Sequence, residues 1–309
     1  MFSFLLLSVG VALLVAGLVA PRFLGEDSRL PLDLEATTWT LVDGEAQTRL
    51  MTDADGRVLE VPVSRQLHME IQNPADEETA TLRVGETLMR DSRQAELDRL
   101  IAAEVWTFGV DRATGEFTTP ATLTDQLASP VSEVPVDGVW LKFPAGAEQT
   151  AYEVFDPTLR QTRPAEFAEE LEMDGRTVHR YRQEIRPVNV AELYAGPFNT
   201  TTFPDGERGY LFHSVTRDIL VDRVSGLVVE IREDVDDYYG TADGEKREQV
   251  LLFEGRMPQG QIDAHLAEAG EVRDPAFTDT LRWVAVGVGA VLTLLGLAGA
   301  FGAFGRRRR

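Results

Sequence analysis

The sequence has 309 residues, 43% of them hydrophobic, so it can bury at least one sizeable core and a largely disordered chain is excluded. It carries 30 Lys and Arg against 51 Asp and Glu, a formal net charge of −21, and a surface of this sign repels nucleic acid. There is no cysteine, which excludes disulfides, thiolate nucleophiles and cysteine zinc sites.

The first predicted element is an apolar helix within residues 1–24. Residues 1–20 carry no charged side chain and, at about 1.5 Å per residue, span about 30 Å, the thickness of the hydrocarbon layer. No basic side chain precedes this run, and Pro21 would follow a signal-peptide cut after Ala20, which disfavours cleavage. We therefore prefer an uncleaved transmembrane anchor to a cleaved signal peptide, and both interpretations stay open.

The negative charge is concentrated in the segment that follows. All acidic residues lie between Glu26 and Asp279, where 24 basic residues face 51 acidic ones and leave a charge of −27. Adaptation to strong salt produces such an excess, because high ionic strength screens the self-repulsion of a compact acidic domain. A salt-adapted protein and an ordinary acidic one both stay open, and thermal stability measured against salt would separate them.

Residues 25–280 have the turn chemistry of β-structure. Asp-Gly pairs, which are strong hairpin signals between strand-like runs, begin at positions 43, 55, 137, 174, 205 and 243. The pattern predicts a mainly β, α+β fold of antiparallel sheets. Two helices are predicted within it, over residues 91–103 with Asp91 as N-cap and over residues 258–270.

One phrase, Val-Asp-Arg-x-(Thr/Ser)-Gly, occurs twice, at residues 110–115 and 221–226. Its Asp accepts backbone hydrogen bonds at the start of a turn, and its Gly takes the left-handed conformation that ends the turn. Each copy therefore predicts a strand–turn–strand unit. Either the segment contains two duplicated β-subdomains, residues 25–135 and 136–280, or the same turn chemistry arose twice.

A second membrane helix is predicted over residues 281–305. The run from Trp283 to Gly305 has no charge, and four arginines form a basic tail at residues 306–309. The positive-inside rule places this tail in the cytoplasm, so a two-pass plasma-membrane protein has both termini inside and residues 25–280 outside. A stripe of small residues in the first helix, which would either pack on Gly287 and Gly289 of the second or face lipid, consists of Ser8, Ala12, Ala16 and Ala20.

Few residues suggest chemistry. The four histidines are scattered without metal-ligand spacing, and no nucleophile or phosphate-loop motif occurs, so no catalytic, metal-binding or cofactor-binding residue is assigned. Of the 30 basic residues only Lys142 and Lys246 are lysines, which makes Lys142 a candidate for a buried ion pair or a ligand contact, with chance as the alternative. Asn199 begins an Asn-Thr-Thr sequon in a predicted exposed loop and is a candidate for N-glycosylation.

The stretch around Lys142 also carries a family resemblance. The residues concerned are Gly138, Lys142, Pro144, Tyr152, Asp156, Pro157, Pro164 and Tyr181. With the repeated turn phrase and a helix at each end, they resemble a mostly actinobacterial envelope family of unknown function known as PorA-like. The resemblance implies a two-helix membrane protein with a large extracytoplasmic domain, and it transfers no catalytic residue.

These observations favour a non-enzymatic, double-anchored envelope protein whose acidic outer domain contacts membrane lipid and binds an envelope component or a protein partner. One alternative is an envelope hydrolase or transferase that uses carboxylates as acid and base. Another is an oligomeric channel or lipid conduit, since two helices from one chain enclose no pore. An apolar groove would favour lipid handling, and a polar cleft with two carboxylates about 5 to 10 Å apart would favour glycan hydrolysis.

Overall fold

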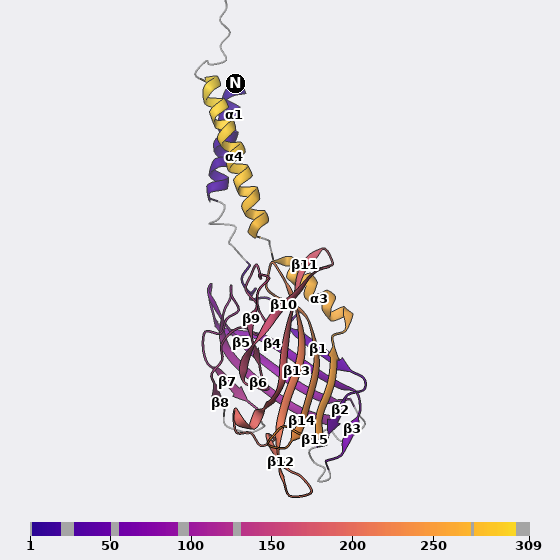
Figure 1. Ribbon diagram of the computed structural model, residues 1–309. Coiled ribbons are helices and arrows are strands. Elements are labelled where there is room, and N and C mark those ends of the chain that lie inside the picture. Colours follow the sequence, from indigo (N-terminus) through magenta and orange to yellow (C-terminus); the bar gives the residue numbers. More distant parts are fainter. Residues whose placement is uncertain are drawn as a thin grey trace, which may run out of the picture. The chain divides into compact units, whose positions relative to one another are not determined.

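The computed structural model describes residues 2–19, 28–50, 56–91, 99–125, 131–272 and 275–300 (Figure 1). It contains two compact units, one made of Met1–Ser28 with Arg273–Arg309 and the other of Arg29–Val272. The basic tail at residues 306–309 and Pro21 lie outside the described residues. In chain order the elements are α1 (Phe2–Val19), β1 (Thr38–Asp43), β2 (Gln47–Arg49), β3 (Val58–Glu60), β4 (Val63–Ala75), β5 (Thr79–Arg90), β6 (Leu100–Asp111), β7 (Ala121–Thr124), β8 (Ser132–Val134), β9 (Tyr152–Asp156), β10 (Gln161–Met173), β11 (Arg176–Asn189), η2 (Val190–Glu192), β12 (Thr200–Thr202), β13 (Arg208–Asp222), β14 (Val228–Gly240), β15 (Lys246–Arg256), α3 (Gln259–Glu271) and α4 (Pro275–Ala300).

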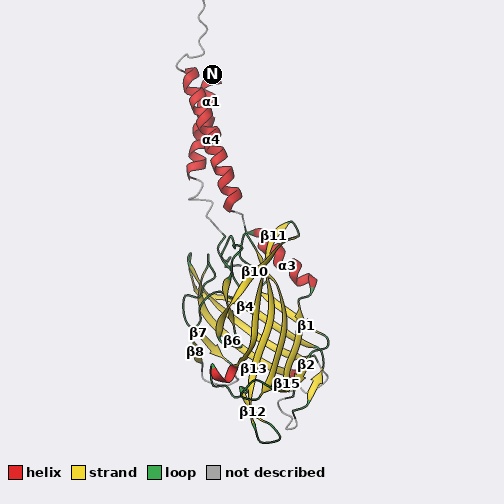
Figure 2. Ribbon diagram, viewed as in Figure 1, coloured by secondary structure: helices red, strands yellow, loops and turns green. Residues whose placement is uncertain are grey.

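The larger unit consists mostly of strands (Figure 2), and these strands form one antiparallel sheet. Its main path runs β8-β7-β6-β5-β4-β1-β15-β14-β13-β11-β10-β9, so neighbours in the chain are mostly neighbours in the sheet. At the β10–β11 turn, Asp174 and Gly175 both have positive φ, as a two-residue hairpin loop requires. The predicted mainly β, antiparallel fold with helices at both ends of the chain is therefore confirmed. The sheet joins strands from both predicted subdomains, and their origin by duplication stays a prediction.

The two halves of the sheet pack against each other around an aromatic core. In Figure 1 the indigo-to-magenta strands of the first half pass at a steep angle behind the orange strands of the second. Trp106 of β6 is fully buried, with ring centroids 5.4 Å from Phe155 of β9 and 6.3 Å from Trp140. Residues 139–143 contact both halves, since Trp140 packs on Trp106 of β6 and Val139 bridges to Val154 of β9.

The two predicted helices of this unit have different outcomes. Helix α3 confirms the helix predicted over residues 258–270, and its His265 stacks on Trp39 at 4.8 Å. The helix predicted over residues 91–103 is wrong for residues 100–103, which open strand β6, and residues 92–98 lie outside the described residues. These residues form a strand because they pair with β5, where Ala102 lies opposite Leu88. Such tertiary pairing overrides a short helical pattern in the sequence.

The smaller unit is an antiparallel pair of helices. A Cβ added at Gly10 would lie 2.5 Å from the Thr293 backbone nitrogen, and one at Gly289 would lie 2.8 Å from the Leu14 backbone nitrogen. Of the two alternatives for the small-residue stripe, packing on the second helix is wrong for Ser8, Ala12 and Ala16, which are exposed, whereas Gly10 and Gly17 are buried; Ala20 lies outside the described residues. The two helices meet at glycines because a residue without a Cβ allows the closest approach of the two backbones.

One helix among the described residues is long and apolar enough to cross a membrane, over Thr280–Gly299 of α4. The apolar part of α1, Phe4–Val19, is shorter. Of the two glycines predicted in the helix contact, Gly289 is confirmed, and Gly287 has nothing within 4 Å of an added Cβ. Length and composition thus identify one candidate span, and the second span belongs to the proposal below.

Candidate functional site

The repeated turn phrase and Lys142 form a single structural feature. Asp111 accepts hydrogen bonds from the backbone of Ala113 and Thr114, at 2.9 and 2.8 Å, and Asp222 accepts from the backbone of Ser225 at 2.8 Å. Both turns pack closely against the segment that contains Lys142. A Cβ on Gly115 would overlap the Lys142 carbonyl, and one on Gly226 would overlap the carbonyl of Phe143. The two turns therefore hold the same connecting segment from two sides.

Lys142 is 1% exposed and its contacts are internal. Its Nζ donates to the carbonyl oxygens of Phe143, at 2.5 Å, and Ala113, at 3.3 Å. Burial lowers the pKa of Lys142 to about 7, even though the carboxylates of Asp111 and Asp222 act to raise it. These hydrogen bonds tie Lys142 to the first of the two turns, and both a buried ion pair and a ligand contact at Lys142 stay predictions.

We expect Lys142→Arg to lower the free energy of unfolding by about 1–3 kcal/mol, because the larger guanidinium overfills a closed pocket. Lys246 is the matched control, since its side chain is 42% exposed and pairs with Asp236. Lys246→Arg is expected to change stability by less than about 0.5 kcal/mol. Urea unfolding of the two variants measures the difference, and equal stabilities would contradict the packing argument.

Asn199 is less accessible than the sequence suggested. Its side chain is 6% exposed, and its Nδ2 donates to the carbonyl oxygen of Tyr194 at 2.9 Å. The expected exposed loop is therefore wrong at this residue, although the neighbouring Phe198 is 56% exposed. Glycosylation of Asn199 stays a prediction. It would have to precede folding, because the amide nitrogen that carries a glycan is enclosed in the folded domain.

A chain of alternating charges runs through the interior of the sheet. Arg65 of β4 contacts Glu86 at 2.7 Å and Glu233 at 2.6 Å. Arg217 of β13 contacts Glu233 at 2.5 Å and Asp156 at 3.2 Å. His213 continues the chain, with Nδ1 2.6 Å from Asp237 and Nε2 3.5 Å from Asp156. We call this set the buried charge chain; it comprises Glu86, Arg65, Glu233, Arg217, Asp156, His213 and Asp237.

The carboxylates in the buried charge chain keep His213 charged. Burial acts to lower the pKa of His213, but Asp237 and Asp156 outweigh burial and raise it to about 10. Burial likewise acts to raise the pKa of Asp156, and His213 and Arg217 outweigh it, so that pKa lies far below its usual range. The charges are therefore mutually dependent, and loss of one leaves its neighbours uncompensated.

The pH dependence of stability should show the contribution of His213. Its folded pKa exceeds the unfolded value of about 6.5, so its stabilisation is complete below pH 6.5 and is lost as the pH rises towards 10. The pKa of Lys142 is lowered in the folded state, so the contribution of Lys142 to stability rises with pH over a similar range. We therefore expect the advantage of wild type over His213→Gln to shrink between pH 7 and 10 in unfolding titrations; a constant advantage would contradict this assignment.

Next to this chain lies a cavity of about 370 Å³, called here the inner cavity. Its size falls within the range of about 300–1,000 Å³ that is typical of small-molecule sites. Phe198 and Leu100, both lining residues, are 56% and 38% exposed. The apolar part of the wall comprises Leu50, Leu88, Leu100, Ile101, Ala102, Pro157, Phe198, Leu211, Val235, Val250, Leu251 and Phe253. The charged part comprises Arg65, Glu86, Arg90, Glu104, His213 and Asp237.

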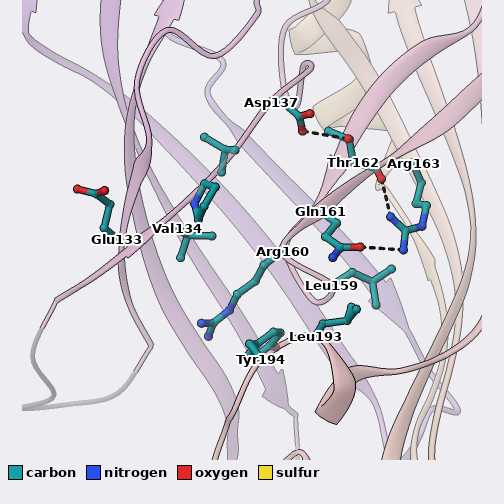
Figure 3. A pocket seen from close by; sticks show the side chains of 12 residues that line it. Glu133, Val134, Asp137, Leu159, Arg160, Gln161, Thr162, Arg163, Leu193 and Tyr194 are labelled. Atoms are coloured by element: carbon teal, nitrogen blue, oxygen red, sulfur yellow. Dashed lines mark hydrogen bonds between the residues drawn. The ribbon is translucent and has the colours of Figure 1, made fainter.

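A second, larger hollow of about 660 Å³ lies between β8 and the turn that joins β9 to β10; we call it the outer groove (Figure 3). Arg160 reaches towards Tyr194 there, with its guanidinium 3.8 Å from the ring centroid and Nη2 2.9 Å from Asp125. Arg160 has a φ of 54°, a conformation uncommon outside glycine. Tyr194 lines both the outer groove and the inner cavity, and its hydroxyl donates to the Thr158 carbonyl at 2.9 Å.

No sequence motif unites these residues, because they are far apart in the chain. A signal for some of them is nevertheless present, since Arg65, Arg217 and Glu233 each occupy an inward position between buried apolar residues of an alternating strand. A charged residue in such a position must find a buried partner. The acidic run at residues 233–237 also contributes buried Glu233 to the charge chain. No group of three metal-ligand side chains occurs among the described residues.

A family profile and two relatives carry the same name. The profile of a family described as Porin PorA matches residues 2–298. A relative named Porin PorA from Corynebacterium amycolatum is 26% identical over 345 aligned residues, which cover 90% of this chain and 85% of that protein. Another, also named Porin PorA, from Corynebacterium resistens, is 27% identical over 224 aligned residues, which cover 62% of this chain and 53% of that protein. The chain therefore belongs to the PorA family.

Proposed function

We propose that this chain is a non-enzymatic, membrane-anchored envelope protein whose β-domain binds an amphiphilic envelope component. The observation that carries the proposal is the inner cavity, whose wall is largely apolar and reaches the surface at Phe198. Hydrocarbon that enters such a cavity leaves water, and each buried methylene contributes about 0.8 kcal/mol. The charged end of the cavity would orient the polar part of the ligand.

A fluorescent neutral apolar probe, N-phenyl-1-naphthylamine, tests this proposal with the full chain in detergent-free nanodiscs. We expect saturable binding that Ala102→Trp weakens at least tenfold, because Ala102 lines the inner cavity. Ala103 is the matched control, since it is the next residue of β6, is exposed, and does not line the cavity. Equal binding by Ala102→Trp and Ala103→Trp would exclude the inner cavity as the binding site.

A second candidate function, an oligomeric channel or lipid conduit, is favoured by the names of the relatives. For this chain it requires several copies, because the described residues of its smaller unit form two helices, too few to enclose a pore. Conductance across planar bilayers measures it. Reproducible single-channel steps that persist in Ala102→Trp would support the channel and make the inner cavity irrelevant to it.

The proposal places the protein in the plasma membrane as a two-pass protein. Helix α1 packs antiparallel along α4, as the close approaches of Gly10 and Gly289 show, so a bilayer that contains α4 would also surround α1. The basic tail at residues 306–309 would then be cytoplasmic, with the acidic domain outside. Protease added to spheroplasts is expected to digest the β-domain and spare a C-terminal tag. Loss of the tag would overturn this orientation.

A further inference from the structure

The charged end of the inner cavity contains a pair of like charges that the sheet itself brings together. Glu86 of β5 and Glu104 of β6 lie directly opposite each other in the antiparallel register. Both line the cavity. Side chains directly opposite in such a pair have Cβ atoms about 4.5–5.5 Å apart, and like charges at this spacing destabilise the sheet. Local rules of this kind are most often broken where a protein binds something.

The surrounding residues compensate only part of this negative charge. Arg65 contacts the Oε1 atom of Glu86, whereas the buried Oε2 atom accepts no hydrogen bond from the described residues. Glu104 accepts a hydrogen bond from the Trp106 indole at 3.1 Å and makes no ion pair within the described part of the chain. Together with Glu104, the buried charge chain contains five carboxylates against Arg65, Arg217 and a protonated His213.

The cationic side chains near this end of the cavity are already committed to other carboxylates. Arg65 of the cavity wall is shared between Glu86 and Glu233, and Arg160, which acts on Glu104 from outside the wall, contacts Asp125. Arg90 lies four residues beyond Glu86 on β5, about 13 Å along the strand, and donates to Thr48 and to the Arg49 carbonyl. A ligand with a positive group is therefore more complementary to the Glu86–Glu104 end than one with a negative group.

We propose that the inner cavity binds an amphiphile with a protonated amine head, with the ammonium between Glu86 and Glu104 and the hydrocarbon along the apolar wall. This inference rests on the proposed function, because it names the class of ligand for the same cavity. An ammonium group offers several hydrogen-bond donors and one positive charge, which matches an unpartnered carboxylate oxygen beside a second carboxylate.

A proton competes with the ammonium when the cavity is empty. Burial, and then the charge of Glu86, raise the pKa of Glu104 to about 7. A long-chain amine stays protonated well above this pH, so its affinity should rise between pH 6 and pH 8 as Glu104 ionises. The other titratable or charged groups that line the cavity are Arg65, Glu86, Arg90, Tyr194, His213, Asp237 and Tyr239, and the charges of Arg160 and Asp125 also act on Glu104.

Three twelve-carbon probes that differ only in their head test the inference: dodecylamine, dodecanol and dodecanoate, each below its micelle concentration or solubility limit. Displacement of the neutral fluorescent probe gives their affinities at pH 6 and pH 8. At pH 8 we expect dodecylamine to bind at least tenfold more tightly than dodecanol, and dodecanoate more weakly than both. At pH 6 the advantage of the amine should fall several-fold.

Glu104→Gln separates the role of charge from that of folding. We expect this variant to lose the preference for the amine and its pH dependence while it keeps the affinity for dodecanol, which also reports an intact cavity. Glu166→Gln, at an exposed position of β10, is the matched control and should behave as wild type. Equal affinities for amine and alcohol in wild type, or an unchanged preference in Glu104→Gln, would overturn the ammonium site alone. Failure of all three probes to bind would overturn the proposed function with it.

Discussion

Arg217→Ala is expected to lower the free energy of unfolding by about 3–5 kcal/mol, the typical cost of removing one partner from a buried ion pair. Arg217 is 5% exposed and donates to Glu233, Gln183 and Asp156 from three different nitrogens. Its removal leaves, among the described residues, His213 as the cationic partner of Asp156 and Arg65 as that of Glu233. The penalty arises mainly from carboxylates that stay buried without their full compensation.

Arg182→Ala provides the matched control, because Arg182 also forms a two-bond contact with a carboxylate, that of Asp218, on the neighbouring strand. Its side chain is 42% exposed, so solvent replaces the lost contact and the expected cost is below about 1 kcal/mol. Denaturant unfolding monitored by tryptophan fluorescence gives both values. A difference of less than about 1 kcal/mol between the variants would show that the buried charge chain contributes little to stability.

Gly226→Ala should destabilise the fold about as much as Arg217→Ala. We expect it to lower the free energy of unfolding by about 3 kcal/mol or more. Gly226 has a φ of +70°, which costs an L-residue about 1–2 kcal/mol. Its added Cβ would also overlap the carbonyl oxygen of Phe143 and approach that of Pro144. Relief of this overlap would move residues 143–144 away from the turn and break the 2.8 Å hydrogen bond from the Phe143 nitrogen to the Gly226 carbonyl.

Gly146→Ala isolates the effect of close packing. Gly146 has the same φ of +70°, yet an added Cβ there has nothing within 4 Å. We expect the free energy of unfolding of this variant to fall by about 1–2 kcal/mol, which is the conformational cost of a positive φ alone. Thermal or denaturant unfolding of both variants measures the difference, and equal losses would mean that the repeated turns do not clamp the Lys142 segment.

The sequence alone determined the features that depend on local chemistry. Asp-Gly turns and alternating strands predicted an antiparallel β-domain, and an uncharged run of helical length predicted the apolar helix α4. The hydrogen bonds that Asp111 and Asp222 accept in their turns also follow from the repeated phrase. Such features depend on a few consecutive residues, so a hydrophobic periodicity or a short motif is sufficient to predict them.

Tertiary structure decided what depends on residues that are far apart in the chain. Residues 100–103 became a strand because β5 offers them a partner, and Asn199 became buried because the chain around Tyr194 closes over it. The Glu86–Glu104 pair exists only through the register of two strands, and no spacing within the sequence encodes that register. Long-range pairing places these charges beside one cavity, and the free energy of compensating buried charge then determines how they interact.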